Sequence, residues 1–167
     1  MRFGERPMTQ DNHNSYYLEP GYIYFSKRSV TVRTVVGSCV AVCLWDSTRR
    51  YGGMNHFVRP RVDKPEKATP HYGNVATAAL VRIMEEAGCK RGDLSAHIVG
   101  GGCPEGLRRD TVGNANVRAA REVLSRKGIK IVSEDVGGHV GRKLAFNSGT
   151  GELAILKTQK IRQTDWK

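Results

Sequence analysis

Short runs of β-branched, aromatic and apolar residues dominate the first third of the chain, separated by glycine-rich or charged turns. Residues 22–25 and 30–36 are rich in valine and aromatic residues, so they predict two strands. Residues 39–45 are apolar at both odd and even positions, which is typical of a strand covered on both faces. A further short strand is predicted at residues 54–58, with the pair of glycines at residues 52–53 as the turn before it. Together the four runs indicate a β-rich core.

Two later segments change to helical spacing. Apolar residues recur every three or four positions in residues 74–87 and 116–127, which predicts two amphipathic helices. Asn74 is expected to cap the start of the first helix, and Gly88 and Gly128 to end the two helices. The remaining strands are expected at residues 94–99, 129–132, 140–146 and 153–156, the last two forming a hairpin.

The segments outside these elements are polar. Residues 59–72 contain three prolines and mixed charge, which predicts an exposed, mobile loop that contacts a partner. Residues 1–15 are expected to form a polar arm, and residues 158–167 a basic tail that frays. Because no repeat and no second compositional zone interrupts the chain, we interpret residues 1–167 as one domain. Its predicted class is α/β, rich in sheet, with two main helices.

Length and charge narrow the function classes. The chain has 167 residues and a formal net charge of +11 at pH 7. Its longest apolar stretch, residues 35–45, is far shorter than the ~20 residues of a membrane helix, and no apolar run follows the first charged residues as in a secretory signal. We therefore expect a soluble, cytoplasmic protein without membrane insertion. The basic residues are scattered, so we expect no nucleic acid as a partner and interpret the charge as a solvated, anion-attracting surface.

The four cysteines predict reduced thiols rather than disulfides, because no secretory signal is visible. No C-x-x-C pair occurs. Convergence of Cys39, Cys43, His56 and Cys103 on a zinc ion is kept as an alternative. The glycine-rich segment that contains Cys103 lacks the Gly-Lys-Ser/Thr ending of a phosphate loop, so no nucleotide site is predicted.

Cys39 is the candidate nucleophile. It follows a Gly-Ser pair at the start of a buried run, where a sharp turn can expose one side chain. Backbone N–H groups of Ser38 and Cys39 in such a turn can hold an oxyanion. A thiol also needs a base, and two antiparallel strands would bring His56 back beside Cys39. The alternatives are that Cys39 is a small core residue like Cys43, and that His139, which also follows two glycines, is the functional histidine.

The motif G-S-C-V-A-V-C-L-W-D is followed by G-G-M-N-H-F, which puts His56 17 residues beyond Cys39. This combination resembles the CheD family of chemoreceptor glutamine deamidases. The resemblance extends over residues 16–157 through further motifs. These are G-G-G at residues 100–102, V-G-N-A-N at residues 112–116, D-V-G-G at residues 135–138, G-R at residues 141–142 and T-G at residues 150–151.

The resemblance implies a layered sandwich of mixed, mostly antiparallel sheet, similar to the catalytic domain of cytotoxic necrotizing factor toxins. It implies hydrolysis of glutamine side-chain amides on methyl-accepting chemotaxis receptors, in some members also of glutamate methyl esters, with no metal or organic cofactor. In several lineages the phosphatase CheC is a partner that occupies the active-site region. Cys39 would be the nucleophile that forms a thioester, His56 the general base and then acid, and Thr34, with Thr31 behind it, the third polar member. The competing hypothesis is a non-catalytic adaptor for receptors or CheC, in which Cys39 and His56 merely pack.

Overall fold

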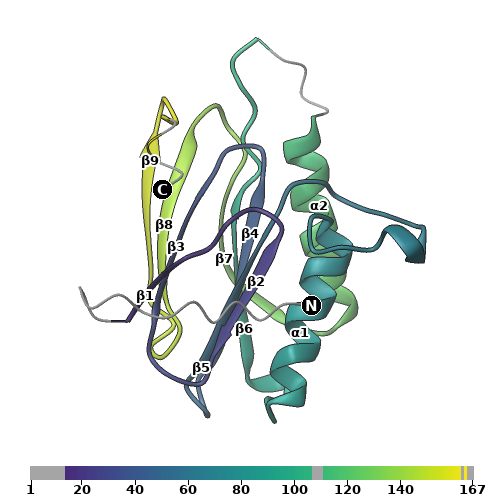
Figure 1. Cartoon of the computed structure of the whole chain (residues 1–167), viewed down its shortest axis with the longest axis vertical. Helices are drawn as coiled ribbons and strands as arrows, with labels where there is room; N and C mark the ends of the chain where they lie inside the picture. The colour runs from purple at the N-terminus through teal and green to yellow at the C-terminus, as the bar shows by residue number, and fades with distance from the viewer. Residues whose placement is uncertain (1–13, 107–110, 163, 165–167) are drawn as a thin grey trace.

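The computed structural model describes residues 14–106, 111–162 and 164. Figure 1 shows three layers side by side: a four-stranded sheet, a five-stranded sheet and two helices. The five-stranded sheet is the middle layer. Its strands are therefore covered on both faces, as the apolar run at residues 39–45 predicts. The observed class is a mixed α/β sandwich with two main helices, in agreement with the sequence.

The outer sheet has the strand order β1-β3-β8-β9. Its strands are β1 (Ser15–Tyr17), β3 (Thr31–Val36), β8 (Gly141–Asn147) and β9 (Leu153–Thr158). β8 pairs antiparallel with both β3 and β9, so the hairpin predicted across residues 148–151 is confirmed. β1 runs parallel to β3.

The middle sheet has the strand order β2-β5-β4-β6-β7. Its strands are β2 (Tyr22–Ser26), β5 (Tyr51–Phe57), β4 (Val40–Asp46), β6 (Leu94–Gly100) and β7 (Lys130–Val136). The three pairings among β2, β5, β4 and β6 are antiparallel, and β6 and β7 are parallel. Antiparallel pairs therefore dominate both sheets, as expected.

The helices α1 (Gly73–Glu86) and α2 (Val112–Arg126) cover one face of the middle sheet, with short 3-10 turns η1 (Pro65–Lys67) and η2 (Arg91–Asp93) in the connections. One apolar core lies between the helices and the middle sheet. A second core lies between the two sheets and is built on Leu18, Val32, Val36, Ala41, Cys43, Met54, Val99, Leu144 and Phe146. In the part of the chain that the structure describes, no helix is both long and apolar enough to span a membrane.

Most element boundaries differ from the prediction by one or two residues, and three differ more in extent or meaning. β7 runs to Val136, four residues beyond the predicted end at residue 132, because its exposed polar residues carry no apolar alternation. Gly52 and Gly53 lie inside β5 rather than in a turn before it. A Cβ at Gly52 would come within 2.6 Å of the Ser148 backbone, so glycine lets the outer sheet pack directly on β5 at this point. α2 begins at Val112 rather than at residue 116, because the small and polar residues of its first turn carry no apolar period.

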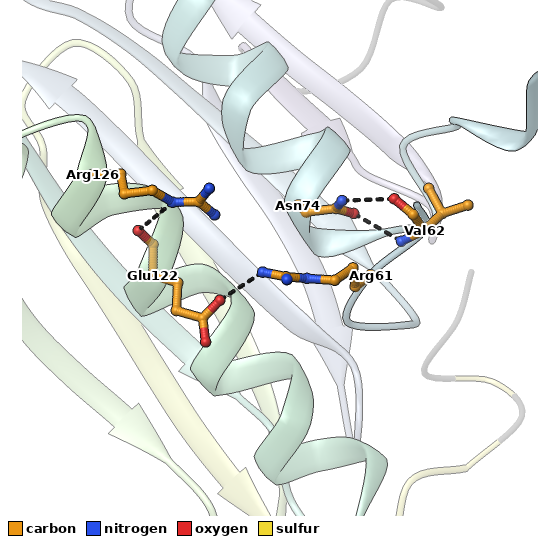
Figure 2. Close-up of polar contacts among 5 residues, drawn as sticks. All are labelled: Arg61, Val62, Asn74, Glu122 and Arg126. Atoms are coloured by element: carbon orange, nitrogen blue, oxygen red, sulfur yellow. Dashed lines mark hydrogen bonds and ion pairs between the residues drawn. The ribbon is translucent and has the colours of Figure 1, made fainter. Parts of the chain in front are cut away.

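The loop at residues 59–72 is tied to both helices (Figure 2). The residue at the N-cap of α1 is Tyr72, and no side chain caps the helix there. The side chain of Asn74 instead accepts a hydrogen bond from the Val62 N–H at 3.1 Å and donates one to the Val62 carbonyl at 2.9 Å. Arg61 forms an ion pair with Glu122 of α2 at 2.7 Å. The predicted cap at Asn74 is therefore wrong, and the loop is anchored at this point rather than free.

The two predicted end segments overlap ordered structure. Ser15 already belongs to β1, so the arm expected at residues 1–15 ends one residue too late; residues 1–13 lie outside the described residues. The strand is stabilised by Tyr16, whose ring stacks on that of Tyr24 at 4.4 Å. At the other end, Ile161 of the expected tail packs against Gly141, and residues 163 and 165–167 lie outside the description.

Candidate active site

The turn at residues 37–39 connects β3 to β4 and so crosses from the outer sheet to the middle sheet. The loop after β6 holds it at both ends. Gly101 N–H donates to the Cys39 carbonyl and Gly102 N–H donates to the Gly37 carbonyl, both at 2.8 Å. The Cys39 thiol is half-buried. A turn that is fixed in this way presents that side chain in one direction.

Cys39 and His56 lie on the same face of the middle sheet. His56 pairs with Ala41 in the antiparallel ladder of β4 and β5, and residues paired across a ladder share a face. Cys39 is two residues before Ala41 and packs on the same core between the sheets. Cys39 directly precedes β4, so extending the ladder by one residue makes the two residues diagonal neighbours, a relation that puts backbones about 7–8 Å apart in a regular sheet. His56 Nε2 makes no hydrogen bond to the Cys39 thiol or to any other described group.

Thr34 reaches His56 from the opposite sheet. Its Oγ1 lies 2.7 Å from His56 Nδ1 and 2.7 Å from the Leu18 carbonyl. The hydroxyl has one proton, and a carbonyl can only accept, so that proton goes to Leu18. Thr34 Oγ1 must then accept from Nδ1–H. This fixes the tautomer of His56, with the proton on Nδ1 and a free lone pair on Nε2.

The surroundings of the pair favour the neutral forms of both groups. His56 is fully buried, and its Nε2 has no hydrogen-bond partner. Burial lowers the pKa of His56 to about 4, although a hydrogen bond with the Leu18 backbone opposes this shift. Burial also raises the pKa of the Cys39 thiol, partly offset by its own backbone N–H. Both shifts favour an uncharged thiol and a neutral imidazole at neutral pH.

Two backbone amides of the turn are available to a ligand. They are the N–H groups of Ser38 and Cys39. Within the described residues, neither Ser38 nor Cys39 donates its amide to a backbone carbonyl. These are the two groups that the sequence predicts for an oxyanion.

The other candidates occupy different settings. His139 is exposed and donates from Nδ1 to the Cys103 carbonyl at 2.8 Å. Cys43 and Cys89 are buried, and burial raises the pKa of both thiols, that of Cys89 to about 12. Among residues 14–106, 111–162 and 164, no three His, Cys, Asp or Glu side chains form a group that could hold a metal ion. The zinc alternative therefore has no ligand set in this part of the chain.

Comparison with known proteins gives a consistent family. The model of a family described as "CheD chemotactic sensory transduction" matches residues 59–157. A "Probable chemoreceptor glutamine deamidase CheD" from Sulfurimonas denitrificans is 38% identical over 147 residues, which cover 86% of this chain and 94% of the relative. The chain belongs to the CheD family. CheD relatives with the same description from Trichlorobacter lovleyi and Rhodospirillum rubrum are 37% and 39% identical; both alignments cover 89% of this chain, and they cover 93% and 85% of the relatives.

Among solved structures, the hypothetical protein YfiH from Bacillus licheniformis aligns at 14% identity with a TM-score of 0.44. The alignment covers 68% of this chain and 49% of YfiH. This likeness is too low to support any conclusion, so the CheD assignment rests on sequence.

Two buried polar residues inside the matched CheD segment support the turn and escaped the sequence analysis. Asn116 donates to the Ser38 carbonyl at 2.9 Å. Arg142, 2% exposed, donates to Asp135 and to the Gly137 carbonyl, each at 2.9 Å, and so holds the glycine turn before β8. Both residues lie in motifs that carry the CheD resemblance, V-G-N-A-N and G-R; the partner of Asn116 is 78 residues away in sequence, whereas those of Arg142 are five and seven residues away. A buried polar residue in each motif was the available signal.

Proposed function

We propose that this chain is a protein-glutamine deamidase, an amidohydrolase acting on specific glutamine side chains of methyl-accepting chemotaxis receptors. The observation that carries the proposal is the state of His56. Thr34 holds its Nδ1 proton, while its buried Nε2 lone pair has no partner and lies on the same sheet face as Cys39. The names of the relatives, each a probable chemoreceptor glutamine deamidase, support the substrate class.

In the first half of the reaction, His56 Nε2 takes the thiol proton of Cys39 as the sulfur attacks the carboxamide carbon. The carbonyl oxygen becomes an oxyanion, to which the amides of Ser38 and Cys39 donate. His56 then gives its proton to the nitrogen, the C–N bond breaks, and ammonia leaves. A thioester between the substrate and Cys39 remains.

In the second half, water attacks the thioester carbon while His56 accepts a water proton. The C–S bond breaks, the proton passes from His56 to the sulfur, and glutamate leaves. Every proton transfer uses the same imidazole, whose pKa of about 4 keeps it neutral at pH 7, with the Nε2 lone pair unprotonated. A glutamate methyl ester forms the same thioester with methanol as the leaving group. We therefore extend the proposal to methylesterase activity.

The proposal sets the reaction in the cytoplasm, on receptor helices, and includes the phosphatase CheC as a second partner. It also includes similarity of the sandwich to the catalytic domain of cytotoxic necrotizing factor toxins. One observation favours the competing function, a non-catalytic adaptor for the same receptors: burial raises the pKa of Cys39 rather than lowering it. An adaptor binds the receptor and leaves its glutamines unchanged.

The test is incubation of the purified protein with a receptor cytoplasmic fragment, followed by mass spectrometry of the receptor peptides. We expect conversion of glutamine to glutamate by the wild type and loss of nearly all turnover in Cys39→Ala and in His56→Ala, because nucleophile and base act as a unit. Cys89→Ala is the matched control, since Cys89 is buried under α1 and away from the turn. Wild-type turnover in Cys39→Ala would eliminate the mechanism, and receptor binding without conversion would establish the adaptor.

A further inference from the structure

Asn116 joins the two strand ends that carry Cys39 and His56. It lies early in α2 and its side chain is fully buried. Its Nδ2 donates to the Ser38 carbonyl at 2.9 Å and to the Val58 carbonyl at 3.0 Å. Ser38 immediately precedes Cys39, and Val58 is two residues beyond His56. One amide group therefore links the turn of the nucleophile to the strand of the base.

The two partners fix how the amide is oriented. Both are carbonyl oxygens, which can only accept, so the nitrogen of Asn116 must face them. Its Oδ1 then points away and is buried without a partner. An unpaired buried acceptor destabilises a fold. Stability alone therefore does not account for an asparagine at this position, whereas a need for two donors does.

The bond to Ser38 also orients the amide of Cys39. The Ser38 carbonyl and the Cys39 N–H belong to one peptide unit, which is trans like every other described peptide bond. In a trans peptide the C=O and N–H vectors are antiparallel. Once Asn116 holds the carbonyl toward α2, the N–H is directed away from the helix.

The backbone of α2 also contacts the loop at residues 101–102, which holds the Cys39 turn. A Cβ at Gly113 would lie 2.5 Å from the carbonyl oxygens of both Gly101 and Gly102, so only glycine allows this approach. Gly101 and Gly102 in turn donate to the carbonyls of Cys39 and Gly37. The start of α2 is therefore held close to the turn, and Asn116 donates to the Ser38 carbonyl from this fixed position.

We infer that Asn116 is a positioning residue of the active site that sets the plane of the Ser38–Cys39 peptide and thereby aims the Cys39 N–H at the oxyanion. This inference rests on the function proposed above, because the oxyanion forms on the glutamine carbonyl. It makes a distinct claim, namely that the helix acts on the stabilisation of the intermediate and not on the reactivity of the thiol.

Two reactions of Cys39 separate these effects. Deamidation passes through an oxyanion, whereas alkylation by iodoacetamide displaces iodide at carbon and forms none. In Asn116→Ala we expect kcat for deamidation to fall roughly 100-fold, the effect of losing one oxyanion donor. KM and the rate of Cys39 alkylation should stay within about threefold of the wild type, since neither substrate binding nor alkylation passes through an oxyanion. Asn116→Ser, which keeps one hydroxyl donor, should recover part of kcat.

The matched control is Asn55→Ala. Asn55 is equally buried, but its side chain bonds Val42 of β4 and Thr77 of α1 and does not touch the turn. It should lose stability with little change in kcat when both variants are assayed below their unfolding temperatures. Equal loss of deamidation and alkylation in Asn116→Ala would overturn the inference, as would wild-type kcat in that variant.

If the wild type does not deamidate receptors, the proposed function is wrong. A measurement without substrate still tests in that case whether Asn116 orients the Ser38–Cys39 peptide. The amide resonance of Cys39 in 15N-labelled protein should shift in Asn116→Ala and Asn116→Ser and stay in place in Asn55→Ala. An unmoved Cys39 resonance in folded Asn116→Ala would show that Asn116 does not orient this peptide.

Discussion

The middle sheet carries two Cys–His pairs on the same face, and only one of them has the features of a reactive site. Cys39 and His56 are diagonal neighbours across β4 and β5. Cys43 and His97 stand directly opposite each other across β4 and β6, a closer relation in an antiparallel ladder. Both pairs border the core between the sheets. Proximity alone would therefore choose the wrong pair.

Access and hydrogen bonding distinguish the pairs. Cys43 is fully buried and burial raises the pKa of its thiol, so no substrate amide can reach it. Cys39 is half-buried and sits in a turn with two available amides. His56 has one nitrogen held by Thr34 and the other free, while His97 bonds Ser133 across the edge of the sheet. The two pairs therefore differ because Cys39 lies at the start of a strand, in a turn fixed by hydrogen bonds, whereas Cys43 lies inside the strand.

Replacement of each pair in turn gives the largest expected effect. Cys39→Ala and His56→Ala should each lower kcat/KM for receptor deamidation by more than about 1000-fold. Cys43→Ala and His97→Asn should stay within about threefold of the wild type, because the second pair meets no substrate. Initial rates measured at a temperature where all four variants are folded check this. If Cys43→Ala is as inactive as Cys39→Ala, the nucleophile has been wrongly chosen.

Stability in acid should also separate the two histidines. The pKa of His56 is lowered from 6.5 to about 4 by burial, so the unfolded chain binds the proton first as pH falls. The contribution of His56 to stability is complete above pH 6.5 and is lost as pH falls toward 4, amounting to about 3 kcal/mol over that window.

Urea unfolding of wild type and His56→Gln at pH 7 and pH 4.5 measures this contribution. The wild type should lose more stability between the two pH values than the variant does. Burial also lowers the pKa of His97, so His97→Gln should show a change of the same sign but smaller. Equal pH dependence in wild type and His56→Gln would mean that His56 is not held neutral by the fold.

Loss of the hydroxyl that holds His56 should have an intermediate effect. Thr34→Val keeps the shape of the side chain but leaves Nδ1–H without its acceptor, and an unpaired buried donor costs about 1–3 kcal/mol. We expect kcat to fall roughly 10- to 100-fold with little change in KM, and the acid limb of the pH profile to move. Ser133→Ala, which removes the partner of His97, is the control and should leave kcat and the profile unchanged.

Local pattern located every strand but β1, because apolar and β-branched runs mark them. For Cys39 and His56 it gave a prediction, based on one antiparallel connection. It also selects between the two threonines once β3 is known. Thr34 shares its face with Val32 and Val36 of the inner core, whereas Thr31 points the other way. The contact of Thr34 with His56 could not be predicted, since it joins strands of different sheets and local sequence does not assign strands to sheets.

The role of Asn116 was hidden for a related reason. Small and polar residues in the first turn of α2 weaken the apolar period, so the predicted helix begins at residue 116 and this residue looks like a terminus. Its function depends on how α2 packs against the loop at residues 100–102. The three-residue strand β1 was missed because its pairing with β3, rather than its own composition, defines it.

The smallest expected effect concerns positive charge at the end of the sheet that carries Cys39 and His56. A depression of about 400 Å³ begins at Val58 and is lined by Arg59, Lys67 and His71. Val58 follows Phe57, the ladder partner of Val40, and Val40 follows Cys39, so the depression lies at the same end of β4 and β5 as Cys39. We expect Arg59 and Lys67 to attract acidic receptor helices, which makes KM rise as salt is raised from about 50 to 300 mM.

Arg59→Ala with Lys67→Ala should raise KM a few-fold at low salt and flatten its salt dependence, with kcat unchanged, because screened surface charges affect encounter rather than chemistry. Lys130→Ala is the matched control. Lys130 is an exposed cation at the end of β7 remote from Val136, which pairs with Gly100 near the turn. If Lys130→Ala changes KM as much as the double variant does, the attraction comes from the net charge of +11 and not from this depression.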